Sequence, residues 1–75
     1  MKLTRENVEA LKLGDILQHV SRKNSDGSPL CAKVTGKPQI WINRSYSFEI
    51  PVKYELYQFF VITREDEEDW IIPED

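Results

Sequence analysis

One histidine and one cysteine, His19 and Cys31, are the residues of this chain whose types could support nucleophilic catalysis. If they lie on paired strands, the imidazole could act as a base toward the thiol. The sequence supplies no third group to orient such a pair and no loop suited to an oxyanion hole. One histidine and one cysteine also cannot complete a four-ligand zinc site. We therefore expect no enzymatic activity, no bound metal and no cofactor.

Two further segments contain residue types that bind ions in other proteins. Glu65–Asp69 is a run of consecutive carboxylates, but it lacks the glycine and the ligand spacing of a calcium loop. Lys33–Lys37 contains a single glycine, which is too few for a phosphate-binding loop. Because adjacent carboxylates repel one another and cannot be buried unpaired, the acidic run is predicted to be a solvated turn.

The basic and aromatic middle of the chain is a better candidate for a functional surface. Residues 22–53 carry a formal charge of +4, whereas residues 64–75 carry −6. Cations interleaved with flat aromatic rings are typical of single-stranded nucleic-acid binding, because cations meet phosphates and rings stack on bases. The net charge of −3 counts against this hypothesis, since dedicated binders are usually basic. The candidate nucleic-acid-binding residues are Lys33, Lys37, Trp41, Arg44, Tyr46 and Lys53.

The competing hypothesis is a protein-interaction module that receives a peptide in an aromatic groove or along an exposed strand edge. It is slightly favoured because it uses the acidic segment, which would attract a basic partner. The candidate protein-binding residues are Trp41, Tyr54, Tyr57, Glu65, Asp66, Glu67, Glu68, Asp69 and Trp70. We expect a small adaptor-type domain with an unidentified protein partner. Weak, sequence-independent binding of single-stranded RNA or DNA is the alternative.

Length and composition limit the architecture. The 75 residues form a single domain, 1–75, and 40% of them are hydrophobic, which is enough for one compact core. A single cysteine excludes an internal disulfide framework and fits a reducing compartment. The N-terminal residues lack the apolar segment of a signal peptide, and no apolar run approaches the ~20 residues of a membrane span. We expect a cytoplasmic protein, without membrane contact, that is a monomer or a weak dimer.

Short apolar runs separated by turn signals predict a mainly β fold, a small and strongly bent antiparallel sheet or barrel. The five expected strands are Ile16–Val20, Leu30–Thr35, Ile40–Asn43, Phe48–Val52 and Phe59–Thr63. Because Pro51 has no amide hydrogen, its strand is expected to lie at an edge or to bend there. The polar loop Ser21–Pro29 is expected to be long and mobile. Trp70–Ile72 is expected to pair back as a short closing strand, with Trp70 docked on the sheet.

Two short helical segments complete the prediction. Thr4 is a suitable N-cap for a helix that runs to about Lys12, with Gly14 ending it. Such a short helix is unstable alone, so its apolar face must cover one open end of the sheet. Tyr54–Tyr57 is predicted to form a one-turn helix before the fifth strand.

Alternation along the strands assigns one face of each to the core. The expected core residues are Val8, Leu11, Ile16, Val20, Leu30, Ala32, Val34, Ile40, Ile42, Phe48, Ile50, Val52, Leu56 and Ile62.

Five short strands, a polar first hairpin loop and a one-turn helix before the fifth strand resemble an SH3-like small barrel. The opening "GDILQHV", followed after a loop by "AKVTG", is similar to the start of KOW-type barrels of ribosome- and transcription-associated proteins, over residues 14–36. Leu30 and Cys31 stand where such motifs usually carry an additional glycine. The segment "IPVKYELYQFFVIT" is similar to one in small uncharacterised phage and bacterial proteins, which implies no activity. The resemblance implies a five-stranded antiparallel SH3-like barrel.

Overall fold

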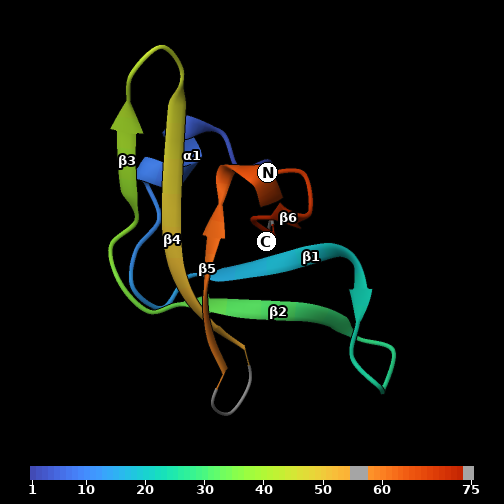
Figure 1. The fold of residues 1–75 in the computed structure, drawn as a ribbon. Helices are drawn as coiled ribbons and strands as arrows, with labels where there is room; N and C mark the ends of the chain where they lie inside the picture. The colour runs from blue at the N-terminus through green and yellow to red at the C-terminus, as the bar shows by residue number, and fades with distance from the viewer. Residues whose placement is uncertain (55–57, 74–75) are drawn as a thin grey trace.

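The computed structural model describes residues 1–54 and 58–73 and is drawn in Figure 1. In chain order its elements are α1 (Arg5–Glu9), β1 (Ile16–Lys23), β2 (Pro29–Val34), β3 (Gln39–Ile42), β4 (Tyr46–Tyr54), β5 (Gln58–Thr63), the 3₁₀ helix η1 (Arg64–Asp66) and β6 (Trp70–Ile71). Every strand pair is antiparallel, so the predicted mainly β, antiparallel class is confirmed. The closing strand predicted after the acidic run is β6, which pairs with β1.

The long strand β4 is the centre of the sheet. The strand order is β3-β4-β2-β1-β6, and β5 pairs with the opposite edge of β4. Residues 46–49 of β4 pair with β3, and residues 52–54 pair with β2. β2 and β3 therefore behave as one strand interrupted at residues 35–38. The sheet curls into a half-barrel, which is compatible with a small β-barrel fold (Figure 1).

Pro51 lies inside this central strand rather than at an edge of the sheet. Its carbonyl accepts a hydrogen bond from the Thr35 N–H at 2.9 Å, so its backbone faces β2 and β3. The hydrogen that proline lacks would point into the interruption between those two strands. A proline is tolerated here because no ladder hydrogen bond is required at that position.

The short helix α1 forms as the sequence predicts but ends earlier. The Thr4 hydroxyl accepts a hydrogen bond from the Asn7 N–H at 3.2 Å, which confirms the N-cap. The helix ends at Glu9 instead of Lys12, because the Lys12 N–H donates to Asp15 Oδ2 at 2.9 Å. Gly14 adopts a φ of +94° in the following turn into β1, beyond the end of the helix.

The core fills the concave, inner side of the sheet, with α1 packed against β3 and β4. Its buried residues are Leu3, Val8, Leu11, Leu17, Ala32, Val34, Phe48, Ile50, Val52, Ile62 and Trp70. Leu30 and Ile40 are only partly buried against this cluster, and Leu56 lies outside the described residues. Most of the predicted core is therefore correct, and Trp70 docks on the sheet as expected.

Three predicted core residues are wrong, since Ile16, Val20 and Ile42 are all exposed. In β1 the error is a shift of one residue, because Leu17 pairs with Ala32 and takes the inward position. A shift of one residue transfers a whole strand to the opposite face of the sheet. Adjacent apolar residues at 16 and 17 fit either choice, and only the pairing with β2 decides between them.

The loop between β1 and β2 is shorter than predicted. It is a five-residue turn, 24–28, in which the Asn24 N–H donates to the Ser28 carbonyl at 2.8 Å. Gly27 has a φ of +89°, which a glycine adopts without strain. Hydrogen bonds from the Ser28 hydroxyl and N–H hold the pKa of Asp26 below its ordinary value. The turn thus carries its own local hydrogen-bond network.

The one-turn helix predicted before the fifth strand falls largely on residues 55–57, which lie outside the described residues. Tyr54, the first residue of that prediction, is the last residue of β4. The 3₁₀ helix of the structure, η1, instead follows β5 and leads to β6.

Candidate interaction surface

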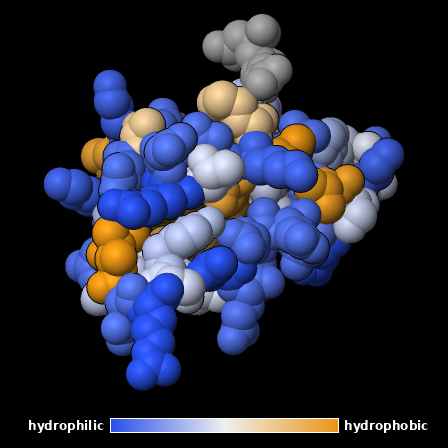
Figure 2. All heavy atoms as spheres, turned by 90° about the horizontal axis from the view of Figure 1, so that it is seen from above, coloured by the Kyte–Doolittle hydropathy of each residue, from blue (hydrophilic) through white to orange (hydrophobic). Residues whose placement is uncertain are grey.

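Viewed from above, the molecule is mainly hydrophilic, and its hydrophobic residues appear in separate small patches (Figure 2). An interaction surface must therefore be built from individually exposed apolar side chains. Several of them lie on the side of the sheet that faces away from the core, which we call the outer face. Its principal residues are Ile16, Lys33, Trp41, Glu49, Lys53, Phe59 and Val61.

One end of the outer face combines lysines with an exposed phenyl ring. Lys53 pairs with Lys33 on β2 and with Phe59 on β5, so the three side chains form one row across the sheet. The Lys53 ammonium lies 5.8 Å from the centroid of the Phe59 ring, within the range of a cation–π contact. Phe59 is 69% exposed and its neighbour on the same face, Val61, is 45% exposed.

The other end of the outer face is built around Trp41. This side chain is 47% exposed and stands opposite Ser47 on β4. It borders a groove of about 290 Å³ that Glu49, Thr63 and Glu65 also line. Glu49 therefore lies between the tryptophan end and the lysine end of the outer face.

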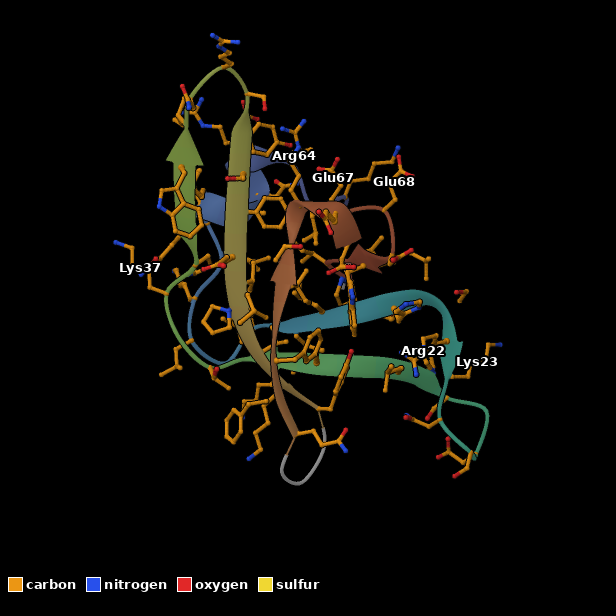
Figure 3. All side chains as sticks on the ribbon, viewed as in Figure 1. Arg22, Lys23, Lys37, Arg64, Glu67 and Glu68 are labelled. Atoms are coloured by element: carbon orange, nitrogen blue, oxygen red, sulfur yellow. The ribbon has the colours of Figure 1, made fainter. Side chains whose placement is uncertain are left out.

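The remaining predicted nucleic-acid-binding residues do not join these side chains closely. Lys37 lies in the interruption between β2 and β3 and projects from the β3 side, away from Arg22 and Lys23 at the far end of β1 (Figure 3). Arg44 is exposed in the turn between β3 and β4. The structure thus brings together Lys33, Lys53 and Trp41 on one face, with Lys37 and Arg44 at its margins.

Tyr46 lies on the opposite, inner face of the sheet. Its ring stacks on Phe48 with 6.3 Å between centroids, and the Arg64 guanidinium lies 4.1 Å above it. Arg64 also donates to the Tyr46 carbonyl, and the Tyr46 hydroxyl lies 3.4 Å from Glu67 Oε2. Arg64 lies over the half-buried Tyr46 ring on the side of the sheet opposite Trp41, so Tyr46 does not join the outer-face candidates.

Two of the predicted protein-binding aromatics, Tyr54 and Trp70, pack together on the inner face. Tyr54 stacks on Phe60 at 4.1 Å between centroids and lies 5.8 Å from the Trp70 ring. Trp70 is only 3% exposed, and partial burial raises the pKa of Tyr54. Tyr57 lies outside the described residues. The inner aromatic rings, including His19 at 5.0 Å from Trp70, therefore form part of the packing.

The acidic run divides between two sides of the molecule. Glu65 lines the Trp41 groove, and Asp66 Oδ2 accepts a long 3.5 Å hydrogen bond from the Thr63 N–H at the start of η1. The Glu67 carboxylate accepts a hydrogen bond from the Tyr46 hydroxyl and forms an ion pair with Arg64, with 3.9 Å between Arg64 Nε and Glu67 Oε1. Glu67 and Glu68 line a second groove of about 400 Å³ near β6, and they project from the end of η1 (Figure 3). Asp69 is exposed, whereas Asp66 and Glu67 are half-buried, so the run is only partly the solvated turn expected.

His19 and Cys31 lie on opposite faces of the sheet. His19 points inward, and its Nδ1 accepts the N–H groups of Ser21 and Arg22 at 3.1 and 2.9 Å. These bonds accompany the irregularity in the β1–β2 pairing that follows Gln18. Cys31 points outward and is exposed. The structure does not bring the imidazole and the thiol together.

Phe59 and Val61 are the surface residues that the sequence reasoning missed. The sequence predicts only that both lie in a strand, although the run from Phe59 to Ile62 is apolar at every position. An uninterrupted apolar strand is typical of a strand that is covered on both faces. In the described part of the chain no helix or further strand packs on their outer side, and this mismatch is the signal that could have identified them.

Across residues 1–54 and 58–73, no group of three or more His, Cys, Asp or Glu side chains is placed to hold a metal ion. None of the helices in this described part is long and apolar enough to cross a membrane.

Comparisons of the chain with protein-family models, with curated proteins and with solved structures find no match.

Proposed function

We propose that this chain is a small non-enzymatic protein-interaction module that binds its partner through the outer face. The observation that carries the proposal is the exposure of the neighbouring side chains Phe59 and Val61 on one side of the sheet, with Trp41 exposed at the far end of the same face. Clustered exposed apolar side chains with polar neighbours mark interaction surfaces in soluble proteins. Aromatic residues are also enriched in the centres of protein interfaces.

The strand order supports an SH3-like topology for the module. If β2 and β3 count as one interrupted strand, the sheet is a meander of four strands, and β6 returns after a 3₁₀ turn to pair with β1. This order resembles the five-stranded arrangement of SH3-like barrels. Such small barrels present sheet faces and edges to their ligands, which agrees with a binding role.

The charges on the outer face indicate the chemistry of the partner. Lys53 borders Phe59, and Lys33 is the next residue of the same row. Lys37 lies near Val61 in a shallow depression that Glu49 also lines. A complementary surface would therefore place apolar side chains against the rings and carboxylates toward the lysines.

Weak binding of single-stranded nucleic acid is a second candidate, favoured by the row of Lys33, Lys53 and the exposed Phe59 ring. Two features weigh against it. Trp41 is separated from that row by about 20 Å, because Lys53 lies six positions along β4 from Ser47, the partner of Trp41. The carboxylate of Glu49 lies along this path and would repel phosphates.

A capture experiment tests the interaction proposal. The immobilised chain is exposed to an extract of its source cell beside the variants Phe59→Ser and Trp41→Ser. The control is Ile42→Ser, because Ile42 is a similarly exposed apolar residue, 61% exposed, on the opposite face of β3. We expect a partner that is retained by the unaltered chain and by the control and lost from both outer-face variants. Equal capture by all four proteins would contradict the proposal.

Titration with short single-stranded DNA and RNA tests the second candidate. If Lys33, Lys37 and Lys53 each contact a phosphate, log affinity should fall with log salt with a slope of about −2. Trp41→Ala should weaken binding by about 1–3 kcal/mol if the ring stacks on a base. If neither the amide shifts of Lys33, Lys53 and Phe59 nor the tryptophan fluorescence changes at high micromolar ligand, nucleic-acid binding is rejected and the interaction proposal stands.

A further inference from the structure

Strand β5 is paired along only one edge in the described part of the chain. The Pro51 carbonyl points toward β2 and β3. Because successive residues of a strand direct their backbone groups to opposite edges, the N–H and C=O groups of Ile50 and Val52 point toward β5. Those two residues pair with Ile62 and Phe60. Along β5, the alternate residues Phe59, Val61 and Thr63 must therefore direct their N–H and C=O groups to the unpaired edge.

This unpaired edge lacks the features that usually protect an edge strand. Natural proteins place lysine, proline, a bulge or a covering element at exposed edges. β5 has the sequence QFFVIT, with no charge and no proline, and its pairing with β4 is regular over six residues. Phe59 and Val61 are among the residues whose edge-facing backbone groups have no partner in the described ranges, and their side chains are also exposed. Such an edge is suited to receive another strand.

We propose that the occupant is a second copy of this chain, whose β5 pairs antiparallel with the first about a two-fold axis at Val61. In this register Val61 stands opposite Val61 of the second copy, and Phe59 stands opposite Thr63 of the second copy. In this antiparallel register, Phe59, Val61 and Thr63, whose N–H and C=O groups point to the unpaired edge, all find a partner residue in the second copy. The product is a symmetric dimer with one continuous sheet across both copies.

Charge favours a second copy in this orientation. On the outer face, Lys53 is next to Phe59 at one end of β5, and Glu49 is next to Thr63 at the other. Antiparallel pairing places the basic end of each copy beside the acidic end of its neighbour. The Thr63 N–H donates a long hydrogen bond of 3.5 Å to Asp66 Oδ2. Because this bond is long, the Thr63 N–H can exchange it for a hydrogen bond to the neighbouring strand.

The dimer does not rest on the proposed interaction function. It is formed by backbone groups at the β5 edge, and the outer-face side chains remain on the surface of the extended sheet. Self-association is measured on the purified chain alone, whereas the interaction function is measured by partner capture. Failure of one is therefore distinguishable from failure of the other.

Sedimentation equilibrium of the purified chain tests the proposal. We expect a monomer–dimer equilibrium for the unaltered chain, weakened at least about tenfold by Val61→Lys, because like charges then stand directly opposite at the axis. The control is Ile42→Lys, which adds the same charge at an exposed site away from β5 and should leave the equilibrium unchanged. A chain that stays monomeric at millimolar concentration would overturn the proposal, as would a dimer insensitive to Val61→Lys.

A charge-complementation experiment guards against misfolding of the variant. Val61→Glu should also be monomeric alone, and mixing it with Val61→Lys should restore a dimer that contains one copy of each. Restoration shows that both variants fold and that position 61 lies at the axis. If both variants show folded circular dichroism spectra and their mixture stays monomeric, the proposed register is wrong.

Discussion

The two faces of the sheet carry similar residue types that differ in their accessibility. The inner face holds Trp70, Tyr54 and Phe60 in mutual ring contact, with Trp70 almost fully buried. The outer face holds Trp41, which is 47% exposed, and Phe59, which is 69% exposed and lies beside Lys53. Neighbouring residues of one strand, Phe59 and Phe60, therefore belong to different environments. Aromatic content alone does not distinguish a packing residue from a binding residue in this protein.

Coverage explains the difference between the faces. α1 and β6 close over the inner side of the curled sheet (Figure 1). In the described ranges no element of the chain packs over the outer side of β5. Substitutions on the inner face should therefore change stability, whereas those on the outer face should change binding.

The two tryptophans provide the sharpest test of this comparison. Trp70→Ala should lower the free energy of unfolding by about 3–5 kcal/mol, because it empties a buried site and detaches β6. Trp41→Ala, at an exposed site, should change it by less than about 0.5 kcal/mol. Urea denaturation followed by circular dichroism measures both. Similar losses in the two variants would mean that the faces are not energetically distinct.

A matched aliphatic pair extends the test to β4 and β5. Ile50→Ala should cost about 2–4 kcal/mol, since Ile50 is fully buried. Val61→Ala should cost less than about 0.5 kcal/mol in monomeric conditions. The comparison is made at low micromolar protein so that self-association does not contribute. A large loss from Val61→Ala at this concentration would place Val61 in the core.

The helix that covers the inner face should contribute a smaller amount. Thr4→Ala removes the acceptor for the Asn7 N–H and should cost about 1 kcal/mol. Thr4→Ser retains a hydroxyl and serves as the control. If thermal unfolding of Thr4→Ala matches that of Thr4→Ser, the cap does not contribute to closing the inner face.

The smallest expected effect is a pH dependence from Tyr54. Burial raises the pKa of its phenol in the folded state, so the folded chain retains this proton more strongly than the unfolded chain. The corresponding stability is present below the ordinary tyrosine pKa and is lost as the pH rises through the raised value. The stability of Tyr54→Phe should fall less over this alkaline range. Parallel alkaline curves for the two proteins would remove Tyr54 as a cause.

Several residues of the candidate surface could be predicted from the sequence, but the complete set of its residues could not. Lys33, Lys53 and Trp41 alternate with apolar residues, so their outward placement follows from the period of a strand. Tyr46 fits the same basic and aromatic pattern, yet Arg64 reaches it from a distant segment and covers its ring. Phe59 lies in a run of apolar residues, so the sequence does not mark it as exposed. Only the tertiary structure shows that no other element of the described chain packs over it.

The sequence by itself determined the antiparallel β class, the Thr4 cap and the inward residues of β4, where Phe48, Ile50 and Val52 alternate with less apolar positions. These features are local, because they depend on side-chain spacing within one segment. Tertiary structure alone decided that Leu17 rather than Ile16 faces the core, and that one edge of β5 remains unpaired among the residues that the structure describes. Each of these depends on pairing with strands distant in the chain, since adjacent apolar residues fit either face until a neighbouring strand fixes the register.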